Sequence, residues 1–327
     1  MVMSGYLMAY HYMARERKEP VNTFPTAKKF WVRRFFRIAP LYYVVLLGAC
    51  LVAPAVREGR IILQGIDPAL WAQHPIYDPR NIHYTPDNIL MHVTFLFGLI
   101  PKYASAVFLP DWSIGLEMQF YAAFPLLFLI LRRTGYLLTA LAGLAVMLAA
   151  KHWFGNFPEP SFLPLKLPLF LIGMLAAESH GVFARTSLQR AFAMVLAMAL
   201  ASRQSVYVLA VTVLVISLGA SENYTEKDGW LRWPKCLNCL LANRLTRFMA
   251  DTSYSVYLIH GTFIAILGGV FYQQEPFLHL TPPVRVAILT GAVLVCSYLA
   301  GYLLFRFVER PGIQFGRNLV RKMSSKT

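Results

Sequence analysis

The sequence predicts an all-α protein built as a polytopic bundle of transmembrane helices. Of its 327 residues, 57% are hydrophobic and only 14% are charged, whereas a soluble domain carries about 25% charged residues. Long stretches such as 137–150 and 206–220 contain no charge at all, as the hydrocarbon interior of a bilayer requires. We expect about eight full spans, a partial helix at the N-terminus and a short or re-entrant segment near 88–100.

The first element is a mostly apolar stretch, 1–13, that runs directly into charged residues. It is shorter than the roughly 20 residues that a spanning helix needs. Eight lysines and arginines follow within 14–37. Because basic residues gather on the cytoplasmic side of a membrane, we expect a cytoplasmic loop there, and the end of a helix before it.

The remaining elements are nine apolar segments without an intervening loop large enough for a separate domain. We therefore expect one integral-membrane domain over 1–327. The segments lie at 38–53, 88–100, 112–131, 136–150, 162–177, 191–201, 205–220, 252–271 and 286–305.

Charge distribution predicts the topology. If all nine segments crossed, the basic tail 306–327 would lie opposite the basic loop 14–37, so one segment must not cross, and 88–100 is the shortest candidate. The remaining eight place 23 of the 31 lysines and arginines in cytoplasmic segments and put 54–87 outside. This predicts an integral membrane protein with a cytoplasmic C-terminus. The net charge of +15 then reflects orientation, and we expect membrane lipids as partners and no nucleic acid.

Cys236 and Cys239 form a single CxxC pair. Structural zinc needs about four ligands, and neither a second pair nor a nearby histidine supplies them. We expect no metal site and no bound cofactor.

The strongest functional candidate is Glu117, because an ionisable group inside a bilayer is costly and marks function by default. Ser113, Glu117 and Tyr121 recur on one face of a helix together with Phe124. This face resembles a pocket more than a lipid-facing surface. The alternative is a structural glutamate paired with a buried arginine.

The second candidate is His260, which lies nine residues beyond Asp251 at the expected cytoplasmic end of its segment. Ser253, Tyr257 and His260 share a face of that helix. A neutral imidazole at this depth can act as a base or a hydrogen-bond partner. The alternative is a histidine satisfied by a neighbouring helix.

A third candidate is the arginine cluster Arg33, Arg34 and Arg37, where the basic loop enters the first long helix. Arg34 and Arg37 share a face, and paired guanidinium groups suit phosphate recognition. A positive-inside anchor explains the same spacing. For Glu309, an ion pair with the neighbouring Arg306 or Arg310 is the simplest expectation.

Five stretches resemble, in order and context, the acyltransferase 3 family of integral-membrane acyltransferases. They are SGYLM (4–8), RRFFRIAPLYY (33–43), WSIGLEMQFYAAFP (112–125), SYSVYLIH (253–260) and FVERP (307–311). The resemblance implies a bundle of about ten helices that moves an acyl group, expected to be acetyl, from cytoplasmic acyl-CoA to a hydroxyl. The implied acceptor is an envelope polysaccharide, a lipid-linked glycan or a similar molecule. The implied location is the bacterial cytoplasmic (inner) membrane.

This resemblance assigns roles to the candidates above. Glu117 and His260 are the expected catalytic groups, and Arg34 and Arg37 are expected to hold the phosphates of coenzyme A. Trp112, Ser113, Tyr121, Ser253 and Tyr257 are the expected substrate-binding residues.

Family members begin with a further helix that carries an Arg and, eleven residues later, a His that is the presumed base. The sequence contains no such helix before SGYLM, so we expect an N-terminally truncated family member whose activity depends on the upstream segment. Two alternatives to an enzyme stay open. One is a transporter or flippase of a glycan or lipid-linked substrate, since buried Glu and His also mark transport paths. The other is an inactive acyltransferase remnant.

Overall fold

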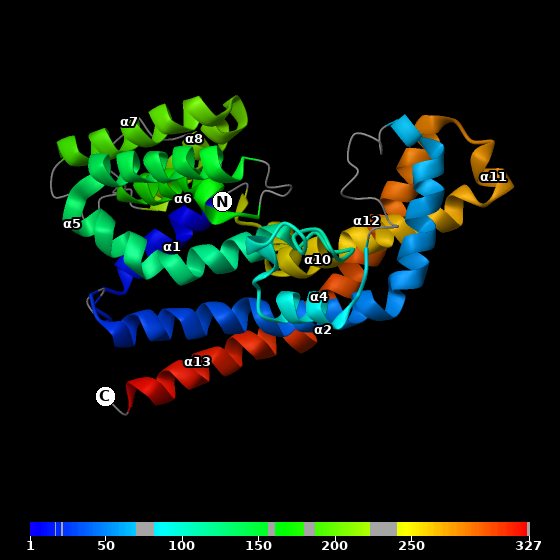
Figure 1. Cartoon of the computed structure of the whole chain (residues 1–327), viewed down its shortest axis with the longest axis horizontal. Helices are drawn as coiled ribbons and strands as arrows, with labels where there is room; N and C mark the ends of the chain where they lie inside the picture. Colours follow the sequence, from blue (N-terminus) through cyan, green and yellow to red (C-terminus); the bar gives the residue numbers. More distant parts are fainter. Residues whose placement is uncertain are drawn as a thin grey trace. The chain divides into compact units, whose positions relative to one another are not determined.

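The computed structural model describes residues 1–16, 18–20, 22–69, 82–155, 161–179, 187–222 and 241–325. Within these ranges the regular elements are all helical, which confirms the predicted all-α class (Figure 1). The principal elements are α1 (Val2–Ala14), α2 (Phe24–Ile66), α4 (Pro86–Val93), η3 (Phe97–Leu99), α5 (Trp112–Phe154), α6 (Leu163–Glu178), α7 (Ser187–Gln204), α8 (Val206–Glu222), α10 (Arg244–Tyr272), α11 (Glu275–Leu278), α12 (Pro282–Leu304), η5 (Phe305–Glu309) and α13 (Arg310–Ser324). Cys236 and Cys239 lie outside the described residues.

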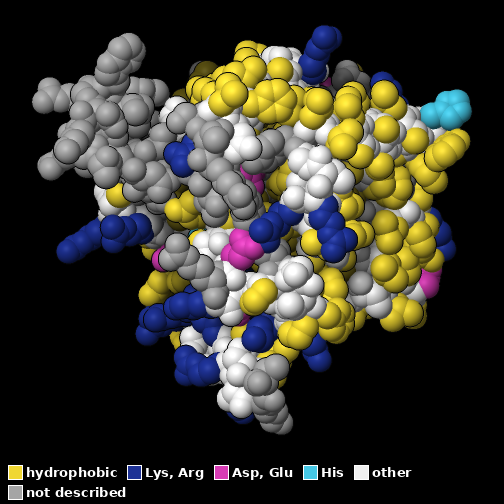
Figure 2. Space-filling view, turned by 90° about the vertical axis from the view of Figure 1, so that its left-hand side faces the viewer, with side chains coloured by type: hydrophobic (Ala, Val, Ile, Leu, Met, Phe, Trp, Pro, Cys, Tyr) yellow, Lys and Arg dark blue, Asp and Glu magenta, His cyan; other side chains and the backbone are white. Residues whose placement is uncertain are grey.

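Five helical stretches are long and apolar enough to cross a membrane: Phe24–Ile66, Trp112–Gly135, Leu137–Phe154, Arg244–Tyr272 and Pro282–Ser324. The described residues thus support an integral membrane protein, but they do not establish the expected eight spans. Large apolar side chains of α5 and α12 are exposed, among them Leu126 and Leu299. Figure 2 shows wide areas of hydrophobic side chains on the face that it presents.

The segment 88–100 forms the eight-residue helix α4 and the three-residue turn η3. Both are far shorter than the roughly 20 residues of a span, in agreement with the prediction of a short segment. Phe95 between them has a positive φ of 59°, a left-handed conformation that is uncommon for a bulky residue. The helical conformation is therefore interrupted here.

Helix α2 corrects two predicted loops. It spans 43 residues, or about 65 Å, and takes in much of the expected basic loop 14–37 and the first part of the expected outer loop 54–87. Pro40 and Pro54 lie inside it, and interior prolines kink a helix without necessarily ending it. Figure 1 shows the resulting bend. The prediction placed the helix start too late because charged residues were assigned to a loop.

Helix α5 joins two predicted segments, 112–131 and 136–150. The helical conformation is broken at Gly135, where φ is 80° and ψ is 179°. Glycine adopts a positive φ readily because it has no Cβ. The break between the two predicted segments is therefore a kink at Gly135, and both segments lie in separate candidate spans, Trp112–Gly135 and Leu137–Phe154.

The chain divides into two compact units. Unit 1 contains Met1–Phe30 and Glu117–Arg247, and unit 2 contains Trp31–Leu116 and Phe248–Thr327. In unit 1, α1 packs against α6 and α8, and α6 packs against α7. The α1–α6 contact depends on Gly5 and Gly173, because a Cβ at Gly5 would collide with the carbonyl of Phe170, and one at Gly173 with that of Val2.

In unit 2, α10 packs closely on α2 and α12. A Cβ at Gly301 of α12 would lie 2.6 Å from a methyl group of Val256, and one at Gly59 of α2 would overlap the carbonyl of Ala265. Helix α13 lies beside α2, and its residues Gly312 and Gly316 face Pro40 and Phe36 (Figure 1). These backbone contacts hold α2, α10 and α13 around the polar groups described next.

Candidate active site

In unit 1, Glu117 of α5 lies at the centre of a small group of hydroxyls. Ser4 of α1 donates a hydrogen bond to Oε1 of Glu117 over 2.9 Å. Tyr121, one turn further along α5, donates to Oε2 over 3.1 Å. Both carboxylate oxygens are thus bound by neutral donors, and no arginine of the described residues forms an ion pair with Glu117. The alternative of a structural Glu–Arg pair is therefore not supported.

Aromatic rings surround this group. Tyr121 packs edge-on against Phe30 with ring centroids 6.2 Å apart, and Phe30 stacks on Phe124 at 5.0 Å. Tyr12 of α1 contacts Phe30, Phe124 and Phe128 in T-shaped arrangements. An apolar wall lowers the local dielectric constant and so strengthens the hydrogen bonds of the carboxylate.

In unit 2, the first turn of α5 meets the middle of α10. The hydroxyl of Ser113 donates to that of Tyr257 over 3.0 Å. The Nδ1 atom of His260 lies 2.6 Å from the carbonyl oxygen of Tyr257, and since a carbonyl only accepts, Nδ1 carries the proton. In the neutral ring, Nε2 then has its lone pair available, as a general base requires. Trp112 adjoins Ser113 and is half-buried.

Ser253 does not join this group. It is exposed and donates to the carbonyl of Ala250 on its own helix over 2.8 Å. The predicted face of α10 therefore contributes Tyr257 and His260 to this group. Ser253 instead forms its hydrogen bond with the backbone of its own helix, as serines in helices commonly do.

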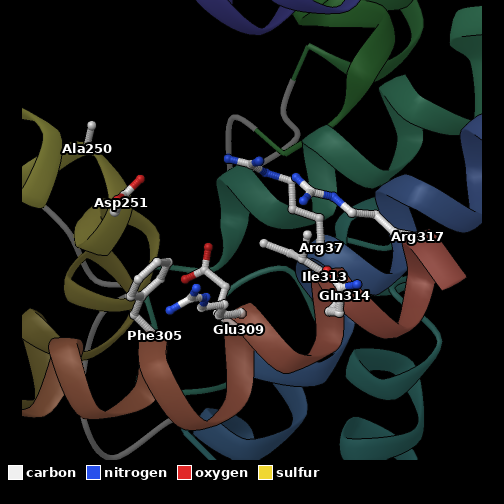
Figure 3. Close-up of a pocket in the computed structure, with 9 residues that line it drawn as sticks. Arg37, Ala250, Asp251, Phe305, Glu309, Ile313, Gln314 and Arg317 are labelled. Carbon is white, nitrogen blue, oxygen red and sulfur yellow. The ribbon is translucent and has the colours of Figure 1, made fainter.

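Arg37 lines a cavity of about 520 Å³ in unit 2. Figure 3 shows that its walls come from α2, α10 and the continuous stretch of η5 and α13. Three arginines and two carboxylates face it, together with smaller or apolar residues: Arg37, Arg310, Arg317, Asp251, Glu309, Ala250, Phe305, Ile313 and Gln314. Arg34 is half-buried and is not among these lining residues. Of the predicted Arg34–Arg37 pair, Arg37 lines this cavity, together with Arg310 and Arg317 of α13.

Glu309 is buried, with 3% of its surface exposed. Its Oε2 accepts a hydrogen bond from Ser255 of α10 over 2.9 Å. Among the described residues it forms no ion pair with Arg306 or Arg310, so the expected pairing is wrong. Glu309 belongs to the π-helical turn η5, and π turns inside α-helices are frequent at functional sites.

Sequence reasoning did not assign site roles to Ser4, Arg310 and Arg317. Ser4 lies 113 residues from its partner Glu117, and nothing in the periodicity of either helix predicts that contact. The only available signal was the position of Ser4 in SGYLM and of Arg310 in FVERP. Arg317 lay in a basic tail whose charges the positive-inside rule already explained.

The long apolar helices define an integral membrane protein. Unit 1 contains a carboxylate bound by hydroxyls, and unit 2 contains an imidazole, hydroxyls and a cavity lined by guanidinium groups. The chain belongs to the acyltransferase domain family, whose profile matches residues 1–302. It is a membrane acyltransferase. It is also similar to a Komagataeibacter xylinus protein named "Putative membrane-bound transacylase BcsY", with 26% identity over 335 residues that cover 96% of this chain and 75% of the relative. No solved structure matches this chain.

Proposed function

We propose that the protein is an O-acyltransferase that moves an acetyl group from cytoplasmic acetyl-CoA to a hydroxyl of an envelope polysaccharide or lipid-linked glycan. The observation that carries the proposal is the Ser113–Tyr257–His260 group, in which Nδ1 of His260 is bound and Nε2 is left as an acceptor. Membership of an acyltransferase family favours this activity over transport.

The reaction needs a base, an electrophile and donors for the developing charge. The acceptor hydroxyl attacks the thioester carbonyl, its proton passes to the base, the new C–O bond forms and the C–S bond breaks. The departing thiolate takes up a proton, so that an ester and free coenzyme A result. His260 and Glu117 are the candidate bases, and the hydroxyls of Tyr257 and Ser113 are candidate donors to the oxyanion.

The cavity lined by Arg37, Arg310 and Arg317 supports a role in binding the acyl donor. Guanidinium groups bind phosphate oxygens through paired, charge-assisted hydrogen bonds. Three arginines and two carboxylates line the cavity, which leaves an excess of positive charge that an anion can neutralise. A basic α13 and the basic residues of the neighbouring helix ends favour the cytoplasmic side for this cavity, and hence a cytoplasmic C-terminus in the inner membrane.

The test is a transfer assay on membranes that contain the full gene product. Radiolabelled acetyl-CoA is supplied, and label is measured in extracted polysaccharides and lipid-linked glycans. We expect label in one glycan fraction, its loss in His260→Gln, and normal transfer in the matched control His279→Gln, because His279 is an exposed histidine. Longer acyl-CoAs added as competitors determine acyl specificity.

No transfer from any acyl-CoA to any fraction would overturn the proposed donor and acceptor. Transfer that is insensitive to His260→Gln would leave acyl transfer standing but would remove His260 from it.

A further inference from the structure

Unit 2 contains a buried polar cluster that the proposed reaction does not use. Tyr42 of α2 and His92 of α4 are both 0% exposed, and Asp111, directly before α5, is 2% exposed. Buried carboxylates and imidazoles are costly unless they are hydrogen-bonded. Their presence at the junction of three elements therefore calls for a specific role.

Two groups approach the same oxygen of Asp111. The hydroxyl of Tyr42 donates to Oδ2 over 2.8 Å. Nε2 of His92 lies 3.5 Å from the same Oδ2. The imidazole is held from its other side, because Nδ1 lies 2.9 Å from the carbonyl oxygen of Asn88 and must donate to it. Its ring also stacks on Phe97 with centroids 4.3 Å apart.

This geometry favours a proton between His92 and Asp111. With Nδ1 protonated, a neutral ring presents the lone pair of Nε2 to a carboxylate oxygen, and two acceptors would then face each other out of contact with water. Nε2 is buried and has no hydrogen-bond partner in the described structure. One proton shared by Nε2 and Oδ2 removes the conflict.

Burial lowers the pKa of His92 to about 4, so the imidazole is neutral near pH 7. In this interpretation of the geometry the proton belongs to the carboxyl of Asp111. Tyr84 is a titratable group near Asp111, and Tyr43 is one near the hydroxyl of Tyr42. Another titratable group near the hydroxyl of Tyr42 is Tyr254 of α10. Its hydroxyl donates to the carbonyl of Ile38 over 3.2 Å.

The cluster is joined directly to the candidate site. The carbonyl of Asp111 accepts the first backbone hydrogen bonds of α5, from Ile114 over 2.8 Å and Gly115 over 3.1 Å. Gly115 lies against the ring of Phe97, since a Cβ there would be 2.9 Å from Cζ. Asp111 thus fixes the first turn of α5, and Ser113 is the residue of that turn that reaches Tyr257.

We propose that Asp111 is a positioning residue of the transfer site, held by the hydroxyl of Tyr42 and by a proton shared with His92. The cluster keeps the first turn of α5 where Ser113 meets Tyr257. This inference rests on the proposed function for its kinetic consequence, whereas the shared proton is independent of any substrate.

The shared proton is tested by infrared spectroscopy of the full chain in lipid nanodiscs near pH 7, without substrate. We expect the carbonyl stretch of a protonated, buried carboxyl, which Asp111→Asn removes and the control Asp87→Asn retains, because Asp87 is exposed. A wild-type spectrum without this band, or a folded Asp111→Asn that keeps it, overturns the proposal. If Asp111→Asn does not fold, the spectrum of His92→Gln is measured instead. A carbonyl band at the same position as in the wild type then overturns the proposal.

The positioning role is tested by kinetics of Tyr42→Phe and His92→Gln, with His279→Gln as the control. We expect kcat to fall about tenfold with KM for the acyl donor within about twofold, since small misplacements of reacting groups act on the chemical step. The positioning role is overturned if the folded variants keep the wild-type kcat, or if KM rises about tenfold while kcat does not change. If the wild type transfers nothing, the proposed function fails, and the infrared band still decides whether the proton is shared.

Discussion

The Glu117 group of unit 1 and the arginine-lined cavity of unit 2 handle charge in opposite ways. Glu117 is bound by two neutral hydroxyls and enclosed by aromatic rings. The cavity instead combines three guanidinium groups with two carboxylates around open space. An apolar, hydroxyl-bound carboxylate is suited to proton chemistry, whereas an open cavity with surplus cations is suited to holding an anion. The comparison predicts that variants of the first act on kcat and variants of the second on KM.

The largest effect is expected for Glu117→Gln. The amide keeps the size of the side chain and still accepts from Ser4 or Tyr121, so the fold should survive while the negative charge is lost. Removal of a general base costs about 10²–10⁴ in rate, and we expect kcat to fall by at least about 10² with little change in KM for acyl-CoA. The control is Glu58→Gln, at an exposed position of α2. A Glu117→Gln enzyme with normal kcat would break the comparison.

A smaller loss is expected when the support of Ser4 is disturbed from a distance. Gly173→Ala places a Cβ against the carbonyl of Val2, and such overpacking destabilises by about 1–3 kcal/mol. We expect a lower Tm in nanodiscs and a reduced kcat, because α1 can no longer hold Ser4 against Glu117. Gly48→Ala is the matched control, since its Cβ would meet nothing within 4 Å and alanine favours the helix.

Arg37→Ala tests the other half of the comparison. Loss of one charge-assisted hydrogen bond costs about 1.5–3 kcal/mol, so we expect KM for acyl-CoA to rise at least about tenfold while kcat is nearly kept. Added salt should reduce the difference in KM between the wild type and Arg37→Ala, because salt screens the charges of the cavity. Arg306→Ala is the control, as Arg306 is exposed and does not line the cavity. Equal effects of both variants would show that only general surface charge matters.

The smallest effect is expected at Asp87, an exposed carboxylate that, like Glu117, accepts a hydrogen bond from a tyrosine hydroxyl. Its Oδ2 accepts from Tyr103 over 3.0 Å and from Lys102 over 3.3 Å. Hydrogen bonds from Thr85 and Tyr103, with the nearby Lys102 charge, hold the pKa of Asp87 below its usual range. The stabilisation is therefore fully present above the ordinary aspartate pKa of about 3.9, and it is lost gradually as the pH falls from there through the lower pKa of the folded state.

Asp87→Asn should accordingly lower Tm slightly at pH 7 and by a smaller amount at pH 3, and both changes should be small because exposed pairs contribute little. Differential scanning calorimetry at the two pH values measures this. A fall in Tm as large as that of Gly173→Ala would contradict this prediction, because it would mean that the exposed Asp87 contributes as much to stability as a buried contact does.

The sequence was informative where partners lie on one helix and uninformative where they do not. Glu117 and Tyr121 share a face by spacing alone, and so do Tyr257 and His260. The Ser4–Glu117 contact and the Ser113–Tyr257 contact join residues 113 and 144 positions apart, and only tertiary packing brings these together. Arg34 was paired with Arg37 by spacing, but Arg37 faces the cavity beside arginines of another helix.

The fold followed the same division. Hydrophobicity predicted helices throughout, because burial of backbone polar groups in lipid requires them. It misplaced the start of α2, since the charges of Lys28 and Lys29 argue for a loop and yet lie on a helix. It also treated the region after Pro54 as a loop, although a kinked helix can continue past a proline.

The π turn η5 determines the helical phase of everything that follows it. Each residue of an α-helix advances the chain by about 100°, so the extra residue of a π turn rotates α13 by that angle relative to α12. Deletion of Val308 would return the turn to α geometry and carry Gly312 and Gly316 away from Pro40 and Phe36. Arg310 and Arg317 would turn away from the cavity with them. A single inserted residue thus decides whether the basic C-terminal helix presents its arginines to the interior or to the surroundings.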